Sequence, residues 1–172
     1  MPFPDSFATE RLVAVRLRPE HYADLLRMHA DPVQMAMLGG VRDAARTTEY
    51  LEKNLAHWDA YGFGAWILRD RVGPGGAVVG RAILRHLDVD GADEVEVGYS
   101  LDPACWGRGL ATEIAVACLA HARVDLRLAT VVAVTLPDNA RSRRVLEKAG
   151  LAYERDWLHA GTPHVLYRIR FT

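Results

Sequence analysis

Two segments of this chain combine residue types that could bind an anion and move a proton. The first lies between a predicted strand and a predicted helix, where glycines at 107 and 109 let the backbone turn tightly. Such a turn brings successive N–H groups to one concave side, and the helix that follows adds the positive end of its dipole. We predict a pyrophosphate site formed by these amides and Arg108, and a plain tight turn is the alternative.

Two common nucleotide-binding motifs do not fit this loop. It contains no Gly-Lys-Ser/Thr, which a Walker loop requires, and it lacks the third glycine of the dinucleotide-binding fingerprint. The sequence therefore argues against a nucleoside triphosphate or NAD at this position.

The second segment is a predicted helix over 140–149 that begins after Asp138 and Asn139. Asn139 and Ser142 are three residues apart, so they share one face at the start of this helix. One interpretation is that Asp138 or Asn139 caps the helix and that the Ser142 hydroxyl is merely solvated. The other is that the amide and the hydroxyl contact a bound ligand.

The charge balance excludes several classes of partner. The 172 residues include 21 basic and 22 acidic side chains, for a formal net charge of −1, so no broad positive field exists to hold a nucleic acid. No apolar run approaches the roughly 20 residues of a membrane span, and the N-terminus lacks the basic flank and apolar stretch of a signal peptide. We predict a cytoplasmic protein that binds neither nucleic acid nor membrane.

Neither the cysteines nor the histidines form a recognisable site. Cys105 and Cys118 cannot build a disulfide framework, and neither has a histidine at a helical or adjacent spacing, so we predict no cysteine nucleophile. The seven histidines are scattered without metal-ligand spacing. The run from Asp88 to Gly91 resembles the start of a calcium loop, but no glutamate follows at the twelfth position. We expect a polar turn there and no metal.

Hydrophobic periodicity predicts the elements that must position these segments. Alternating apolar residues indicate strands, and apolar residues three or four apart indicate helices. The predicted strands are 12–17, 63–69, 77–86, 93–101, 129–136, 151–159 and 164–171, and the predicted helices are 20–30, 44–61, 110–123 and 140–149. Turns are expected at 73–76, 88–92 and 161–163. With no repeat and no linker, residues 1–172 are predicted to form a single α+β domain with a mixed, mostly antiparallel sheet.

Three motifs, taken together and in order, strongly resemble the GNAT superfamily of N-acetyltransferases. They are Glu96-Val97-Gly98-Tyr99, then Trp106-Gly107-Arg108-Gly109-Leu110-Ala111-Thr112-Glu113, then Asn139-x-x-Ser142-x-x-Val145-Leu146-x-Lys148-x-Gly150. Within the superfamily the chain is similar to the branch of ribosomal-protein N-terminal acetyltransferases, which also begins with a segment like Thr9-Glu10-Arg11-Leu12. The resemblance spans nearly the whole chain. It implies six or seven strands flanked by about four helices, with central strands that splay apart.

The resemblance also implies which residues bind acetyl-CoA. The family's pyrophosphate loop reads Gln/Arg-x-x-Gly-x-Gly/Ala, and Trp106 stands here in its first position, which matters little because the contacts are mainly backbone amides. Pantetheine would lie between the parting strands, here 93–101 and 129–136. The implied contacts are Ser100, Leu101, Trp106, Gly107, Arg108, Gly109, Leu110, Ala111, Thr112, Asn139, Ser142 and Arg143.

Acetyl transfer to an amine needs a neutral nucleophile, a polarised carbonyl and a proton for the departing thiolate. Ser142 would supply that proton or a hydrogen bond to the sulfur, and N–H groups near Ser100 and Leu101 would polarise the carbonyl. Glu96 is the predicted base, directly or through a water, with Glu94 on the same strand face as the alternative. We expect direct transfer without an acyl-enzyme.

A single carboxylate base can deprotonate some acceptor amines more easily than others. An α-amine with a pKa near 8 needs only about 1 kcal/mol to lose its proton at pH 7, whereas a lysine near 10.4 needs about 4–5 kcal/mol. A peptide or protein N-terminal α-amine is therefore the leading predicted acceptor. A small-molecule amine (an aminoglycoside, polyamine or amino acid), a larger acyl donor such as succinyl-CoA, and a non-catalytic acyl-CoA-binding regulatory module stay open.

The charges also separate along the chain. Basic residues gather in the two segments assigned to the cofactor, at Arg108, Arg141, Arg143, Arg144 and Lys148. Acidic residues gather in the segment that would face a cationic amine, at Asp88, Asp90, Asp93, Glu94, Glu96 and Asp102. We therefore predict one end prepared for an anion and another for a cation. An edge strand near 165–171 is a candidate surface for a homodimer.

Overall fold

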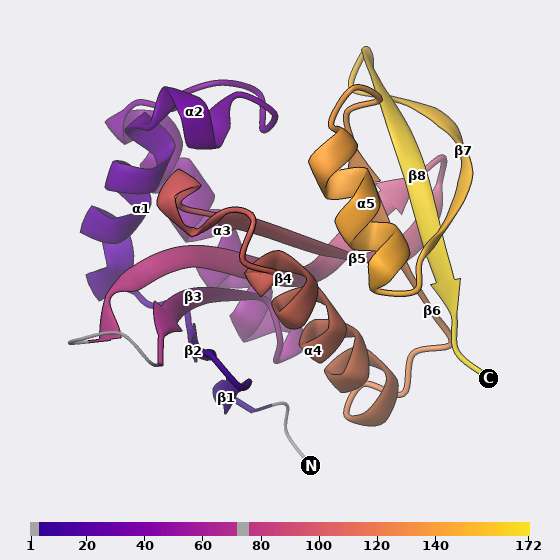
Figure 1. Ribbon diagram of the computed structural model, residues 1–172, viewed down its shortest axis with the longest axis horizontal. Coiled ribbons are helices and arrows are strands. Elements are labelled where there is room, and N and C mark those ends of the chain that lie inside the picture. The colour runs from indigo at the N-terminus through magenta and orange to yellow at the C-terminus, as the bar shows by residue number, and fades with distance from the viewer. Residues whose placement is uncertain (1–3, 72–75) are drawn as a thin grey trace.

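A mixed sheet runs through the molecule, and its longest strands lie in its middle (Figure 1). The computed structural model describes residues 4–71 and 76–172, so most of the predicted turn at 73–76 lies outside them. Within those residues eight strands pair in the order β1-β2-β3-β4-β5-β6-β8-β7. They are β1 (Ser6–Ala8), β2 (Leu12–Arg16), β3 (Ala65–Asp70), β4 (Val78–Val89), β5 (Ala92–Leu101), β6 (Thr130–Thr135), β7 (Ala152–His159) and β8 (Thr162–Arg170).

All neighbouring strands pair antiparallel except β5 and β6, which are parallel, so the predicted fold class is confirmed. The strand beyond the predicted six or seven is β1, whose three residues are too few to show an alternating pattern. Strand β8 lies between β6 and β7, so the prediction of an edge strand at 165–171 is wrong. The candidate homodimer surface at those residues loses its basis.

Helices from both the N-terminal and the C-terminal half of the chain cover the sheet. They are α1 (Tyr22–Ala30), α2 (Pro32–Met35), α3 (Ala44–Tyr61), α4 (Leu110–Val124) and α5 (Ala140–Lys148). The short α2 is the helix beyond the four predicted. Asp31 explains it, because this extended residue ends α1 while its carboxylate accepts hydrogen bonds from the backbone N–H groups of Val33 and Gln34. A residue that stops one helix therefore starts the next.

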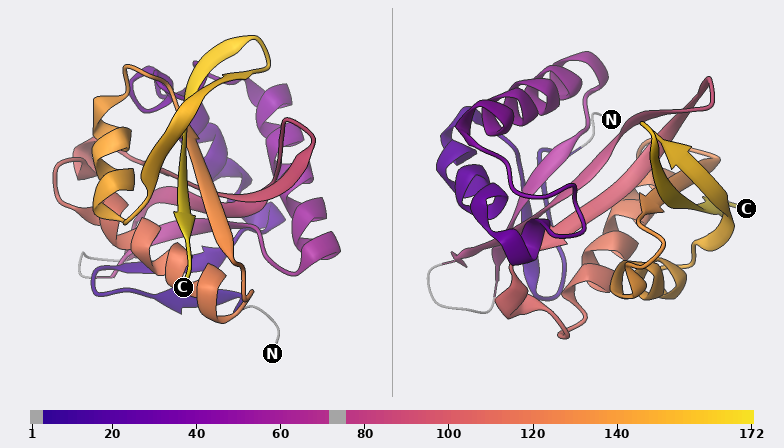
Figure 2. Two further views of the ribbon diagram at one scale, coloured as in Figure 1. Left: turned by 90° about the vertical axis from the view of Figure 1, so that its right-hand side faces the viewer. Right: turned by 90° about the horizontal axis from the view of Figure 1, so that it is seen from above.

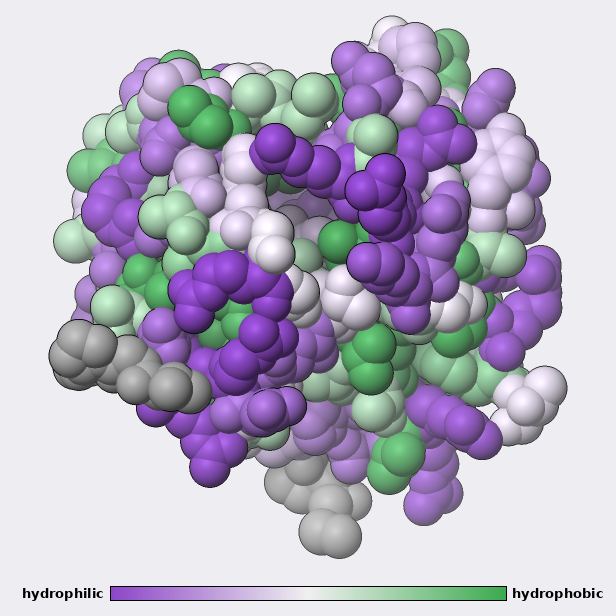
Figure 3. All heavy atoms as spheres, viewed as in Figure 1, coloured by the Kyte–Doolittle hydropathy of each residue, from purple (hydrophilic) through white to green (hydrophobic). Residues whose placement is uncertain are grey.

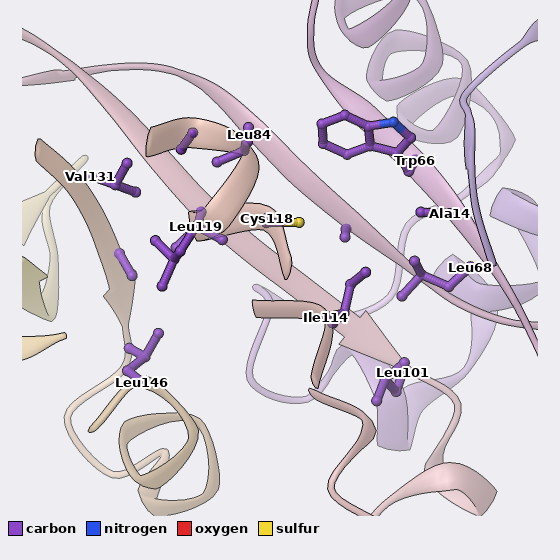
Figure 4. Packing of buried hydrophobic residues seen from close by; sticks show 14 of the residues in the cluster. Ala14, Trp66, Leu68, Leu84, Leu101, Ile114, Cys118, Leu119, Val131 and Leu146 are labelled. Carbon is purple, nitrogen blue, oxygen red and sulfur yellow. The ribbon is translucent and has the colours of Figure 1, made fainter. Parts of the chain in front are cut away.

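Helices pack on both faces of the sheet, which makes a three-layer arrangement visible in Figure 2. One face packs on α4, where Ile114, Cys118 and Leu119 meet strand residues such as Leu84 and Leu101 (Figure 4). The opposite face packs on α1 and α3, with Leu25, Met28 and Leu51 against Ala65, Ile67 and Ile83. The two faces of β5 consequently meet different surroundings, as its alternating pattern requires.

The sheet divides between β5 and β6. Strand β5 pairs with β4 over its whole length, from Val89↔Ala92 to Gly80↔Leu101, while β6 pairs with β8 from Thr130↔Arg170 to Thr135↔Val165. Between β5 and β6 themselves the register is the single pair Glu96↔Val132. Each strand follows its own antiparallel partner, so the two strands diverge beyond that pair. This is the splay expected from the resemblance.

No helix in the described part of the chain is long and apolar enough to cross a membrane.

Candidate active site

Near its C-terminal end at Leu101, β5 directs backbone amides toward the opening between β5 and β6. In an antiparallel pair, alternate residues direct their amides to the partner strand. The Asp102 N–H donates to the Val79 oxygen at 2.8 Å, so the even-numbered residues of β5 face β4. The amides of Tyr99 and Leu101 therefore face the opening, whereas the Ser100 amide faces β4. This corrects the predicted pair of amides from Ser100 and Leu101 to Tyr99 and Leu101.

Two hydroxyl groups meet beside this opening. The Tyr99 Oη of β5 lies 3.3 Å from the Ser142 Oγ of α5, and it donates to the Ser142 backbone oxygen at the same distance. Burial raises the pKa of Tyr99 to about 12, although the hydrogen bond with Ser142 acts in the other direction. The phenol is therefore protonated at neutral pH. The pair joins the two halves of the divided sheet and can donate a proton.

The loop after β5 has the geometry of an anion site. Gly107 and Gly109 adopt φ of +73° and +78°, and Gly109 begins α4 with no side chain capping the helix. The first amides of α4 are thus left without a side-chain acceptor. Trp106 Nε1 donates to the Leu101 oxygen at 2.9 Å, and the Arg141 guanidinium carbon lies 4.7 Å from the Trp106 ring centroid. Arg141 on α5 therefore adds a positive charge beside the loop.

A contact from the start of the chain holds this loop in place. Arg11 Nε pairs with Glu113 Oε2 at 2.7 Å, Arg11 Nη1 donates to the Arg108 oxygen at 2.7 Å, and the Thr9 hydroxyl donates to Glu113. Burial acts to raise the pKa of Glu113, but the hydrogen bonds from Thr9 and Arg11 outweigh it and lower that pKa below its usual value. Residues 9–12 thus bind the first turn of α4, and their hydrogen bonds engage the Glu113 carboxylate.

Glu113→Gln is expected to destabilise the protein by roughly 1–3 kcal/mol at pH 7, because hydrogen bonds to a charged group are lost. A lowered folded-state pKa gives stability that is present above the unfolded value of 4.5 and disappears as pH falls through the folded value. Urea unfolding of both proteins from pH 7 to pH 3.5 should show the gap closing below pH 4.5. The exposed Glu49→Gln is the control, and a gap that does not change with pH would refute this account.

Of the remaining predicted cofactor residues, two form hydrogen bonds within the protein and three lie at the start of α4. Asn139 Oδ1 accepts from the Ser142 N–H at 3.2 Å and so caps α5, which confirms the local interpretation of that residue. Arg143 is directed away from the loop, since it donates to Tyr167 Oη at 3.0 Å and to the Pro137 oxygen at 2.9 Å. Leu110 is buried at the start of α4, where Ala111 and Thr112 are half-buried. The candidate site therefore centres on the loop and on the Tyr99–Ser142 pair.

The opposite face of β5 carries Ser100 and the predicted base. The Ser100 hydroxyl accepts from Gln34 Nε2 of α2 at 3.0 Å, and both side chains are buried. The Glu96 carboxylate pairs with Arg85 Nε at 2.6 Å and is 5% exposed. This face adjoins the opening from the side of α2 and α3, and the molecular surface is hollowed between α2 and α5 (Figure 3).

Comparison with known proteins decides the family. A family model described as an acetyltransferase (GNAT) domain matches residues 11–152. The chain belongs to the GNAT family of acetyltransferases. Such enzymes use acetyl-CoA and an amine, so this chain is an acetyl-CoA-dependent N-acetyltransferase.

Three similar proteins show the extent of the similarity. An Aspergillus fumigatus protein named FsC-acetyl coenzyme A-N(2)-transacetylase is 30% identical over 84% of this chain, which spans 64% of that protein's length. An acetyltransferase structure from Agrobacterium tumefaciens matches at 27% identity with a TM-score of 0.84, covering 96% of this chain and 94% of that one. RimL, a ribosomal L7/L12 alpha-N-protein acetyltransferase in complex with coenzyme A, shares only the fold, at 15% identity and a TM-score of 0.75 over 98% and 97% of the chains.

The GNAT site fits the chemistry of coenzyme A. The left-handed glycines open a concave turn, and a Cβ added at Gly107 would meet nothing within 4 Å, so the turn has room for an oxyanion. The uncapped first turn of α4 and Arg141 provide positive charge around it. The amides of Tyr99 and Leu101 offer donors along the opening, where a pantetheine amide would extend the pairing of β5.

Four of the six carboxylates in the predicted acidic end are paired with arginines of the protein, which the segment itself does not reveal. Asp88 accepts from the Gly91 amide, Asp90 pairs with Arg155 and Trp157, Asp93 with His86, Glu94 with Arg168, Glu96 with Arg85, and Asp102 with Arg27. Arginines from other elements therefore neutralise Asp90, Glu94, Glu96 and Asp102, while Asp88 and Asp93 have no arginine or lysine partner in the described residues.

Sequence reasoning did not assign roles to Tyr99 and Gln34. Tyr99 was visible only as part of the Glu96-Val97-Gly98-Tyr99 motif, and its hydroxyl lies beside Ser142 because α5 returns to the end of β5. Gln34 lies 66 residues from Ser100 and no local signal links them.

The two cysteines are free and buried, and burial raises the pKa of Cys118 to about 12. A thiol with that pKa is a poor nucleophile at neutral pH.

Proposed function

We propose that this protein transfers an acetyl group directly from acetyl-CoA to the α-amine of its acceptor. The observation that carries this proposal is the Tyr99–Ser142 hydroxyl pair, which lies where β5 and β6 diverge. The anion-binding loop follows at the end of the same strand. A proton donor, backbone amides that face the opening and the proposed pyrophosphate site are therefore continuous along one strand and the turn after it.

Acetyl-CoA, when bound, supplies the activated acyl group, and the chain's own groups do the rest. The loop at 107–110 and Arg141 would hold the pyrophosphate. The amides of Tyr99 and Leu101 would orient the cofactor arm and polarise the acyl carbonyl. The Tyr99 hydroxyl, protonated at neutral pH and hydrogen-bonded to Ser142, would give the leaving thiolate its proton. Ser142 then positions Tyr99 or relays that proton.

Glu96 is the proposed proton acceptor for the attacking amine. Its side chain shares a face with Ser100, and Gly98 between them presents no side chain. The carboxylate is buried and held by Arg85 Nε at 2.6 Å, so a single carboxylate is fixed at this place. Such a base fits an α-amine, whose deprotonation at pH 7 costs only about 1 kcal/mol.

Glu96→Gln is expected to lower kcat by about 10²-fold with little change in the KM for acetyl-CoA, because general-base assistance is lost. The matched variant is Glu94→Gln, which removes the neighbouring carboxylate and its Arg168 pair. Steady-state rates with one α-amine acceptor measure both. A larger loss in Glu94→Gln would assign the base to Glu94, and two unchanged rates would leave Glu96 only a structural partner of Arg85.

The acceptor class has two candidates. A peptide or protein N-terminal α-amine is supported by the base argument and by similarity to the ribosomal-protein branch. A small-molecule α-amine is favoured by Arg81 of β4, which stands directly across from Ser100. It also agrees with the name of the Aspergillus relative, which describes an N(2)-transacetylase. In both cases we propose one domain over residues 1–172 that acts in the cytoplasm.

Release of free thiol tests the proposed function. The protein is incubated with acetyl-CoA and a panel of peptides, amino acids, polyamines and aminoglycosides, and thiol formation is followed with each acceptor. We expect release with α-amines well above the rate without acceptor. Thermal stabilisation by acetyl-CoA without thiol release from any amine would instead favour a non-catalytic acyl-CoA-binding module.

A further inference from the structure

A cluster of arginines lies on the face of the sheet next to Ser100. Arg81 of β4 stands directly across from Ser100, and Arg85 stands across from Glu96, so these four side chains share one face. Arg42, just before α3, comes from the other side of the same space, since its guanidinium carbon lies 5.3 Å from the Tyr50 ring centroid and that of Arg81 lies 4.6 Å from it. We call Arg42, Arg81 and Tyr50 the arginine cluster.

The positive charge of this cluster is not balanced by the protein. In the part of the chain that the structure describes, Arg85 has a carboxylate partner in Glu96, whereas Arg42 and Arg81 have none. Arg81 instead donates to Tyr50 Oη at 2.6 Å, and Arg42 approaches His29 Nε2 at 3.4 Å. Burial, followed by the charges of Arg81 and Arg42, lowers the pKa of His29 to about 3. His29 is therefore neutral, and the cluster keeps two positive charges without a counter-ion.

Two buried polar atoms beside the cluster also lack partners. Among residues 4–71 and 76–172, Arg81 Nε and Gln34 Oε1 are buried and make no hydrogen bond. The exposed fractions of these two side chains are only 7% and 5%. Buried polar groups in folded proteins are nearly always paired, so each unpaired one requires an explanation. Here the unpaired atoms are one donor and one acceptor, and both side chains adjoin Ser100.

These atoms border on the proposed reaction centre. Ser100 lies between Tyr99 and Leu101, whose amides face the opening between β5 and β6. The hydroxyl of Ser100 holds the Gln34 amide, so Gln34 Oε1 is placed next to the residue that separates those two amides. Glu96 lies four residues back on the same face, and the Ile83 side chain covers Gly98 between them. An acceptor bound against Ser100 would therefore lie next to the amides proposed to hold the reacting carbonyl.

We propose that the acceptor is a small amine that carries a carboxylate, as in a free α-amino acid. The carboxylate would bind Arg81 and Arg42, and Gln34 Oε1 would accept a hydrogen bond from the amine. This inference rests on the proposed function. A free amino acid fits better than a peptide because its carboxylate is on the same carbon as its amine, whereas in a peptide that group is a neutral amide, which cannot offset the charges of Arg81 and Arg42.

Matched acceptors test this assignment. Thiol release is measured with free amino acids, with the corresponding amino-acid amides, and with dipeptides that begin with an acidic or a neutral residue. We expect kcat/KM for free amino acids to exceed that for their amides by about 10²-fold or more, because a site built for a charged group rejects an analogue that lacks it. Equal values for acids and amides would overturn the inference while leaving the proposed function intact. A preference for dipeptides with an acidic first residue would overturn the small-molecule assignment.

Substitutions in the cluster provide the second readout. Arg81→Gln should bring the acid-to-amide ratio close to one by raising the KM for the amino acid, with the KM for acetyl-CoA unchanged. Arg42 is only half-buried, so Arg42→Gln should disturb folding less than Arg81→Gln. It should reduce the same ratio. Arg123→Gln, an exposed arginine near the end of α4, is the matched control and should keep the ratio of the unaltered protein. Unchanged ratios in both cluster variants would refute the inference.

A binding measurement separates failure of the inference from failure of the proposed function. Free amino acids should raise the Tm of the unaltered protein in the presence of coenzyme A, and Arg42→Gln should lose that shift. If no amine releases thiol but the Arg42-dependent shift is present, the proposed catalytic function fails and the carboxylate site stands. If amines release thiol but no amino acid shifts the Tm or is preferred, the carboxylate site fails.

Discussion

Tyr99→Phe is expected to lower kcat by about 10²- to 10³-fold while leaving the KM for acetyl-CoA nearly unchanged. The substitution removes only the hydroxyl that lies 3.3 Å from Ser142 Oγ, and the ring stays packed against the core on the α4 face. Because the hydroxyl would matter when the thiolate departs, its loss should affect turnover rather than binding. Steady-state kinetics with saturating acceptor measure both constants.

The companion variants show which hydroxyl donates the proton. Ser142→Ala should lower turnover more than cofactor affinity, and by less than Tyr99→Phe if Ser142 only positions the phenol. The double variant should be little worse than Tyr99→Phe alone, because residues that act as a unit are not additive. Tyr153→Phe removes an exposed hydroxyl bonded to Asp156 and serves as the control. A normal kcat in Tyr99→Phe with a large loss in Ser142→Ala would assign the proton to Ser142.

Gly109→Trp is expected to abolish stabilisation of the protein by coenzyme A. Gly109 has a φ of +78° at the start of α4, and its Cβ would lie 3.5 Å from Arg11 Nη2, so a large side chain must displace either Arg11 or the loop. A ligand at 100 times its Kd stabilises a protein by about 2.7 kcal/mol. For a domain of this size that corresponds to a Tm rise of roughly 5–10 °C, which the variant should lose.

The control for this variant must share its backbone strain. Gly161 has a φ of +77° in the β7–β8 turn with nothing within 4 Å of an added Cβ, so Gly161→Trp carries a similar left-handed penalty of about 1–2 kcal/mol far from the loop. Both variants should melt lower than the unaltered protein without ligand. Only Gly109→Trp should fail to respond to coenzyme A. An intact response in that variant would remove the 107–110 loop from the cofactor site.

The elements that sequence reasoning placed correctly depend on neighbours within a few residues. Alternating apolar residues marked β5, glycines marked the turn before α4, and Asn139 marked the start of α5. Each signal has a local cause, such as a pleat, a positive φ or an unpaired helix amide. Where the local pattern was too short, as in β1 and α2, the element was not predicted.

The relations that build the site depend on contacts between distant parts of the chain. The acidic segment at 88–102 shows why, because its carboxylates are neighbours in sequence but their basic partners include Arg27 of α1 and Arg168 of β8. No pattern within the segment records those partners. The expected acidic end is therefore reduced, because the fold pairs four of its six carboxylates with arginines.

By itself, the sequence determined the fold class, the position of the glycine turn before α4 and membership of a family of acetyltransferases. Only the tertiary structure decided that Tyr99 meets Ser142, that Gln34 meets Ser100, and that Arg81 and Arg42 lie against the Tyr50 ring. The reason is physical. Backbone conformation follows from adjacent residues, whereas the charge and protonation of a site depend on which side chains the packed strands and helices place within hydrogen-bond or Coulombic reach.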